Sequence, residues 1–216
     1  MDKVYTDGII FDMDGTIWDN TGVFAASWRR ACLEDGFDVN FTADLLKSLF
    51  GKTMTDIADA CIPSDDLEKR YAALRKCEKY EMDDLRKSKE NTCYPLLHET
   101  IRALCKRIPL YIVSNCQSGY IETFLEMSGL GDCFTDYICY GDNGLVKAEN
   151  IQIIVNKHGL KAPVYVGDIQ GDKDSCVKAG VDFIWASYGY GKSVDAYKAK
   201  ISAISELEQL CEMVER

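Results

Sequence analysis

Short apolar segments and longer amphipathic segments alternate along the second half of the chain. The apolar segments cover residues 108–113, 137–140, 163–167 and 182–186 and predict buried strands. Between them, apolar residues at helical spacing predict helices over 118–129, 148–158 and 172–179. A last helix is expected near 205–214, where Ser205 and Glu208 have the spacing of a capping box. This alternation predicts an α/β fold built on a doubly wound parallel sheet.

The first strand is separated from the next by an unusually long segment. Residues 9–11 are apolar and end near Asp12, whereas the next strand begins near Ile108. A crossover between parallel strands needs only about a dozen residues. Apolar residues recur at helical spacing in this gap, in the groups Phe24, Trp28 and Ala31; Leu45, Leu46 and Leu49; Leu67, Tyr71, Leu74 and Cys77. We therefore expect residues 18–92 to form an inserted all-helical domain, and residues 1–17 with 93–216 to form the core.

Composition narrows the classes of partner. The chain has 216 residues, 35 acidic against 25 basic side chains and a formal charge of −10. This balance disfavours nucleic acid and anionic membranes as partners. The sequence begins Met1-Asp2-Lys3 without an apolar signal region, and the ten cysteines are scattered singly. We expect a cytoplasmic protein with reduced thiols, in which the isolated His98 and His158 do not form a zinc site.

Two carboxylates at the end of the first strand carry the candidate chemistry. Asp12 and Asp14 are one residue apart and are followed by Gly15 and Thr16. Alternation along a strand places both carboxylates on one side, and Gly15 allows the chain to turn. Like charges this close need a shared proton or a divalent cation. The pattern indicates a magnesium site in which one carboxylate acts as nucleophile and the other as acid and base; the alternative is a solvated turn.

Polar residues in two later segments extend this pattern. The strand 110–113 ends in Ser114 and Asn115, and the strand 163–167 runs into Asp168 and Asp172. Lys147 opens a predicted helix between them. In a doubly wound sheet, strand ends meet at the topological switch point, so these groups are expected to gather there. The alternatives are an ordinary polar turn for Ser114 and Asn115, and for Asp172 a carboxylate favoured by the helix N-terminus.

In these four segments the chain resembles the haloacid dehalogenase-like hydrolase superfamily. The resemblance implies that Asp12 attacks phosphorus to form an aspartyl-phosphate and that Asp14 is the acid and base. Ser114, Asn115 and Lys147 would bind the phosphoryl group. Mg²⁺ would be held by Asp12, Asp168 and the backbone carbonyl of Asp14. Supporting contacts would come from Asp172, which orients a metal-bound water or Lys147, and from Thr16.

One position departs from the superfamily pattern. Many relatives have a proline shortly after the motif lysine, whereas Lys147 is followed by Ala148, Glu149 and Asn150. The assignment of Lys147 therefore depends on its spacing from the other motifs and on the absence of a better candidate.

The helical insert resembles the small cap of the subfamily that contains phosphoglycolate phosphatases and beta-phosphoglucomutase. A cap of this kind closes over a small substrate and contributes specificity. Gly51 and Lys52 lie between two predicted cap helices and are candidates for contact with an anionic substrate; an ordinary helix-helix turn is the alternative. The stretch Tyr188-Gly189-Tyr190-Gly191 also resembles this subfamily, although a glycine-rich surface loop is nearly as good an interpretation.

The sequence therefore predicts a magnesium-dependent phosphatase that acts on a small phosphorylated metabolite, in the manner of phosphoglycolate phosphatase. A sugar-phosphate mutase would use the same motifs and is the first alternative. A phosphoacceptor module is a second, which the long insert and Asp14 disfavour. Asp14 also argues against dehalogenase chemistry, because a halide leaving group needs no protonation.

Overall fold

The computed structural model describes residues 2–88 and 90–214, and within them one six-stranded parallel sheet forms the centre of the core. The strands follow the order β4 (Phe134–Cys139), β3 (Leu110–Ser114), β2 (Gly8–Phe11), β5 (Pro163–Gly167), β6 (Asp182–Ala186) and β7 (Ala199–Ile201). Phe11 in β2 is aligned with Ile112 on one side and Val166 on the other. The strand order reverses between β2 and β5, so the switch point lies where β2 ends. The predicted α/β fold class is confirmed.

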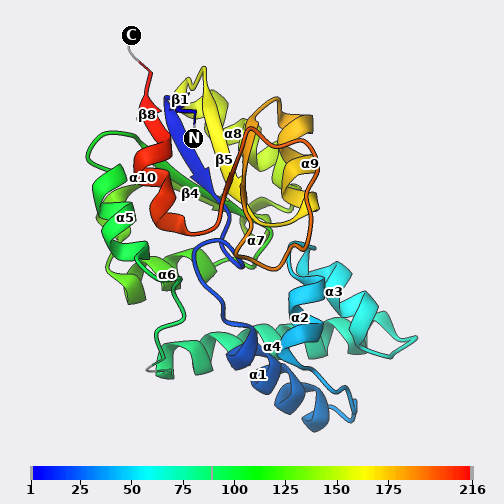
Figure 1. Ribbon diagram of the computed structural model, residues 1–216. Helices are drawn as coiled ribbons and strands as arrows, with labels where there is room; N and C mark the ends of the chain where they lie inside the picture. The colour runs from blue at the N-terminus through cyan, green and yellow to red at the C-terminus, as the bar shows by residue number, and fades with distance from the viewer. Residues whose placement is uncertain (1, 89, 215–216) are drawn as a thin grey trace. The chain divides into compact units, whose positions relative to one another are not determined.

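Helices cover both faces of this sheet (Figure 1). α8 (Lys147–His158) and α9 (Gln170–Ala179) pack together on one face. α8 contacts β3 and β4, and α9 contacts β5 and β6. α5 (Leu97–Leu104), α6 (Tyr120–Ser128) and α10 (Leu207–Leu210) lie on the other. The short α7 (Tyr140–Asn143) follows β4. The faces are apolar because strands buried on both sides need apolar residues at every position, as the fully buried β2, β3 and β5 show.

The C-terminal segment differs from the prediction of one helix near 205–214. A 3₁₀ turn (Ile204–Glu206) and the single-turn α10 are followed by the strand β8 (Cys211–Met213), which pairs in parallel with β1 (Val4–Thr6). Ser205 lies inside the 3₁₀ turn and is not an N-cap, because α10 begins only after Glu206. The prediction is wrong in its length, since helical structure ends at Leu210 and the following residues instead pair with the distant β1. β7 was not predicted either.

Residues Asp19–Thr92 form a separate unit, which we call the helical unit. Its described part contains α1 (Thr21–Glu34), α2 (Ala43–Leu49), α3 (Met54–Cys61) and α4 (Leu67–Lys87). Thr42, Thr53 and Asp66 begin three of these helices with side chains that accept backbone N–H groups. Trp28 packs edge-on against Phe41 at 5.3 Å in its core. Leu67, expected in that core, is 56% exposed at the start of α4.

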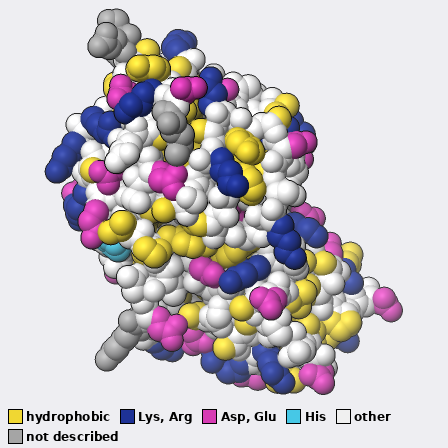
Figure 2. All heavy atoms as spheres, viewed as in Figure 1, with side chains coloured by type: hydrophobic (Ala, Val, Ile, Leu, Met, Phe, Trp, Pro, Cys, Tyr) yellow, Lys and Arg dark blue, Asp and Glu magenta, His cyan; other side chains and the backbone are white. Residues whose placement is uncertain are grey.

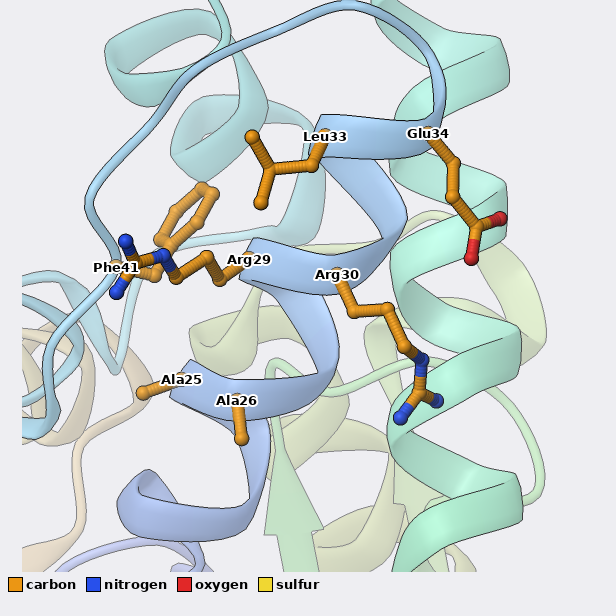
Figure 3. A pocket seen from close by; sticks show the side chains of 7 residues that line it. All are labelled: Ala25, Ala26, Arg29, Arg30, Leu33, Glu34 and Phe41. Atoms are coloured by element: carbon orange, nitrogen blue, oxygen red, sulfur yellow. The ribbon is translucent and has the colours of Figure 1, made fainter.

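A hollow on the helical unit lies along α1 and is shown in Figure 3. The small side chains of Ala25 and Ala26 leave room beside Arg29, Leu33 and Phe41. Arg30 points away from these residues toward α4, where it binds Asp84. None of the predicted site residues lines this hollow.

Surface charge and helix length bear on possible partners. On the face drawn in Figure 2, acidic and basic side chains are interspersed, with no extended basic area. Among the described residues, no helix has both the length and the apolar character that crossing a membrane requires.

Candidate active site

The site begins where the strands beside the switch point end. Asp12 directly follows β2, and its backbone N–H donates to the carbonyl of Val166 in β5 at 2.9 Å. Asp168 directly follows β5, and Ser114 is the last residue of β3. Asp12, Asp168 and Ser114 are each at most 4% exposed. Neighbouring parallel strands therefore bring these side chains to one edge of the sheet, as expected for a doubly wound fold.

Lys147 places a buried ammonium between two carboxylates. It is the first residue of α8, and its Nζ donates to Asp12 Oδ1 at 2.9 Å and to Asp172 Oδ1 at 2.6 Å. Burial alone would lower the pKa of Lys147, but the charges of Asp12 and Asp172 raise it above its ordinary value. The ammonium therefore stays charged at neutral pH and fixes the orientation of Asp12.

Asp172 connects this ammonium to the loop that carries Asp168. It lies in the first turn of α9, and its Oδ2 accepts the backbone N–H groups of Asp168 at 3.0 Å and Ile169 at 3.1 Å. Gly167 allows this close approach, because a Cβ there would lie 2.6 Å from Asp172 Oδ2. With Oδ1 bound to Lys147 and Oδ2 bound to the loop, Asp172 holds the two in fixed positions.

The cluster carries more negative charge than its cation balances. Among the described residues, carboxylate oxygens of Asp12, Asp168 and Asp172 lie within 4.8 Å of one another, and all three side chains are buried. Burial raises the pKa of Asp12 to about 6, against the opposing effect of Lys147. Burial, followed by the charges of Asp172 and Asp12, raises the pKa of Asp168. Hard oxygen donors with unbalanced negative charge fit a divalent cation such as Mg²⁺.

The loop after β6 packs directly on Asp168. The backbone N–H of Tyr190 donates to Asp168 Oδ2 at 2.6 Å, and the Tyr188 hydroxyl donates to the carbonyl of Thr16 at 2.8 Å. A Cβ at Gly189 would lie 2.5 Å from Asp168 Oδ2, so only glycine fits there. This loop therefore positions a candidate metal ligand and does not form an ordinary surface turn.

The remaining predicted residues fall into two groups. Asp14 and Thr16 form the turn after Asp12, where Gly15 has φ 83°, and Asn115 follows Ser114 at the end of β3. Asp12, Lys147, Asp168 and Asp172 lie together within the core. Gly51 and Lys52 lie in the turn between α2 and α3 and belong to the helical unit.

Sequence reasoning missed Tyr120 and the backbone of Tyr190. The Tyr120 hydroxyl donates to Asp14 Oδ1 at 2.6 Å from the first turn of α6. A tyrosine at the start of an amphipathic helix has no sequence feature that distinguishes it from a packing residue. The contact of Tyr190 is made by its backbone N–H, so its side chain gives no sign of it. In the sequence, only the flanking glycines indicate a close approach of the backbone.

Comparison with known proteins agrees with this geometry. The family model described as haloacid dehalogenase-like hydrolase matches residues 9–186. A pyrophosphatase, PpaX, of Oceanobacillus iheyensis is 26% identical over 178 residues, which cover 80% of this chain and 79% of the relative. A phosphoglycolate phosphatase of Pseudomonas putida is 25% identical over 204 residues, which cover 87% of this chain and 72% of the relative.

A solved structure also shares the fold. The crystal structure of a predicted phosphoglycolate phosphatase from Haemophilus somnus superposes with a TM-score of 0.82 at 19% identity, over 94% of this chain and 96% of that one.

Proposed function

Because the chain belongs to the haloacid dehalogenase-like hydrolase family, we propose that it is a magnesium-dependent phosphatase that hydrolyses small phosphate monoesters. The buried cluster at the switch point supports this most directly, since one ammonium lies between two of its three described carboxylates. Phosphoryl transfer depends chiefly on positioned charge, which this cluster supplies.

Asp12 is the proposed nucleophile. A carboxylate oxygen attacks phosphorus, the ester bond to the alkoxide breaks, and an aspartyl-phosphate forms. Water then attacks this phosphorus, so that inorganic phosphate leaves and the Asp12 carboxylate is regenerated. The hydrogen bond from Lys147 to Oδ1 orients the carboxylate for attack.

Asp14 is the proposed acid and base. In the first step its carboxyl group gives a proton to the departing alkoxide, and in the second the carboxylate takes a proton from the attacking water. It is half-buried in the turn after Asp12, two residues from the nucleophile. Ser114, Asn115 and Thr16 are proposed to donate hydrogen bonds to phosphoryl oxygens or to support those that do.

Asp12, Asp168 and the backbone carbonyl of Asp14 are the proposed ligands of Mg²⁺. When bound, the ion would neutralise charge on the phosphoryl group and on the carboxylates. Asp172 is proposed to act through Lys147 and the Asp168 loop, since both of its oxygens already accept hydrogen bonds from them.

The helical unit is proposed to be a cap that selects the substrate, with Gly51 and Lys52 as candidate contacts. An exposed lysine suits an anionic ester. Since one relative is a phosphoglycolate phosphatase and another a pyrophosphatase, phosphoglycolate and inorganic pyrophosphate belong in the first substrate panel.

The test is phosphate release from this panel by the purified protein, with Mg²⁺ and with excess chelator. We expect release only with Mg²⁺, and a loss of at least about a thousandfold in Asp12→Asn, which lacks the nucleophile. Asp182→Asn is the matched control, because Asp182 is exposed at the start of β6. Full activity in chelator would contradict the proposal. Isomerisation of a hexose phosphate faster than phosphate release would favour the mutase alternative.

A further inference from the structure

Tyr120 makes a short hydrogen bond to the proposed acid and base. Its hydroxyl donates to Asp14 Oδ1 at 2.6 Å, and its ring is 1% exposed. Tyr120 begins α6 directly after Gly119, whose left-handed backbone (φ 86°) sets the direction in which the helix starts. The contact therefore joins a rigid helix start to a carboxylate 106 residues away.

Trp18 fixes the ring of Tyr120 in place. The two ring centroids are 4.9 Å apart, and Trp18 also packs edge-on against Phe124 at 5.0 Å. The carbonyl of Trp18 accepts the N–H of Gly15 at 2.9 Å, and Trp18 is bridged to Asp14 through the backbone. Trp18 therefore supports both partners of the hydrogen bond.

The buried Tyr165 and the half-buried Tyr188 use a different kind of acceptor. The hydroxyl of Tyr165 donates to the carbonyl of Val113 and that of Tyr188 to the carbonyl of Thr16, each at 2.8 Å. In both of these bonds the acceptor is a backbone carbonyl and not a side chain. The bond from Tyr120 instead restrains the side-chain torsion of Asp14.

Resting on the proposed phosphatase function, we infer that Tyr120 is a positioning residue that holds Asp14 Oδ1, so that Oδ2 gives and takes the proton. Oδ1 remains a good acceptor for the phenol hydrogen in both protonation states of Asp14 when the exchanged proton is carried by Oδ2. The bond then persists through both half-reactions. In the first, the Oδ2 proton passes to the alkoxide; in the second, Oδ2 takes a proton from water.

The test compares Tyr120→Phe with the wild type on two esters. An alkyl phosphate needs protonation of its leaving group, whereas p-nitrophenyl phosphate needs little. We expect kcat on the alkyl ester to fall by about tenfold or more, and kcat on the aryl ester to fall by less than about twofold. Rates are measured well below the melting temperature of the variant. Tyr111→Phe is the matched control, since Tyr111 is buried at the opposite end of β3.

A double variant separates action through Asp14 from a general effect. In an Asp14→Asn background, Tyr120→Phe should cause no further loss on the alkyl ester, because the group that it positions is gone. Equal losses on both esters in the single variant, or a further tenfold loss in the double variant, would overturn the inference. A wild type that hydrolyses neither ester would refute the phosphatase proposal itself and this inference with it.

Discussion

Two lysines of the described chain each lie between two carboxylates, one in the core and one in the helical unit. Lys147 is 2.9 Å from Asp12 and 2.6 Å from Asp172. Lys76 is 2.9 Å from Glu34 and 2.7 Å from Asp35. The distances are nearly the same, but the Lys147 side chain is 2% exposed and that of Lys76 is 27% exposed. The two lysines therefore differ in how far their charges are exposed to water and not in the distances to their carboxylates.

The difference in burial distinguishes the candidate site around Lys147 from the structural ion pairs around Lys76. Water screens the charges around Lys76, which join the end of α1 to α4 in the helical unit. Burial makes the charges around Lys147 interact strongly, and Asp168 adds a negative charge to them. Buried charge that is not balanced is costly to folding. Its presence at the ends of adjacent strands indicates that it serves chemistry.

The first prediction replaces each lysine by methionine. Lys147→Met should lower phosphate release by about a thousandfold, because the transferring group loses its fixed cation. It should also lower the melting temperature in chelator, because the carboxylates lose their partner. Lys76→Met should leave phosphate release unchanged and shift the melting temperature by no more than about 3 °C. Steady-state rates and thermal unfolding of both variants provide the measurement. Comparable rate losses in the two variants would show that the contrast in burial has no functional meaning.

The second prediction uses the pH dependence of stability in chelator. Burial raises the pKa of Asp12 from 3.8 to about 6, so between these values the folded protein holds a proton that the unfolded chain releases. The protein should therefore become more stable as the pH falls through about 6, with the full gain of about 3 kcal/mol present below 3.8, and should lose this gain as the pH rises through about 6. Asp12→Asn should lack this component.

Asp19, a carboxylate of the helical unit, serves as control, because its effect on stability changes with pH in the opposite direction. Burial alone would raise the pKa of Asp19, but hydrogen bonds from Thr21 and Lys47 lower it. Ionised Asp19 stabilises the fold at pH values above its ordinary pKa of 3.8. This stabilisation is lost as the pH falls through the lower pKa that Asp19 has in the folded protein. Denaturant unfolding of the wild type, Asp12→Asn and Asp19→Asn is measured from about pH 7 to below pH 3.8, so that both transitions are covered. An identical pH profile for Asp12→Asn and the wild type would contradict the assignment.

The sequence predicted the parts of the fold that depend on local pattern. The strands at 163–167 and 182–186 have the predicted bounds, and α8 begins within one residue of the predicted helix. The positions of Asp12, Ser114 and Asp168 at strand ends follow from the alternation alone, because parallel strands end at one edge of the sheet.

The rest depends on partners distant in the sequence. β8 has only three residues and forms because β1 pairs with it, which no local periodicity reveals. The contact of Tyr120 with Asp14 depends on the direction of one side chain across the fold. Likewise, burial and not residue type distinguishes Lys147 from Lys76. Sequence patterns indicated Asp12, Lys147, Asp168 and Asp172, but not the contacts that Tyr120 and the backbone of Tyr190 make with Asp14 and Asp168.

The last and smallest predicted effect concerns substrate choice. If the core supplies the chemistry and the helical unit supplies selection, Lys52→Ala should alter the order of preference among substrates and leave catalysis intact. One exposed charge contact changes kcat/KM by about fivefold, so a small anionic ester such as phosphoglycolate should lose about that factor, while p-nitrophenyl phosphate changes little. Lys69→Ala is the matched control, because Lys69 is an exposed cation on α4 of the same unit. A uniform loss on both esters would show that Lys52 does not select between them. An equal shift in Lys69→Ala would show that the change follows overall charge and not the turn between α2 and α3.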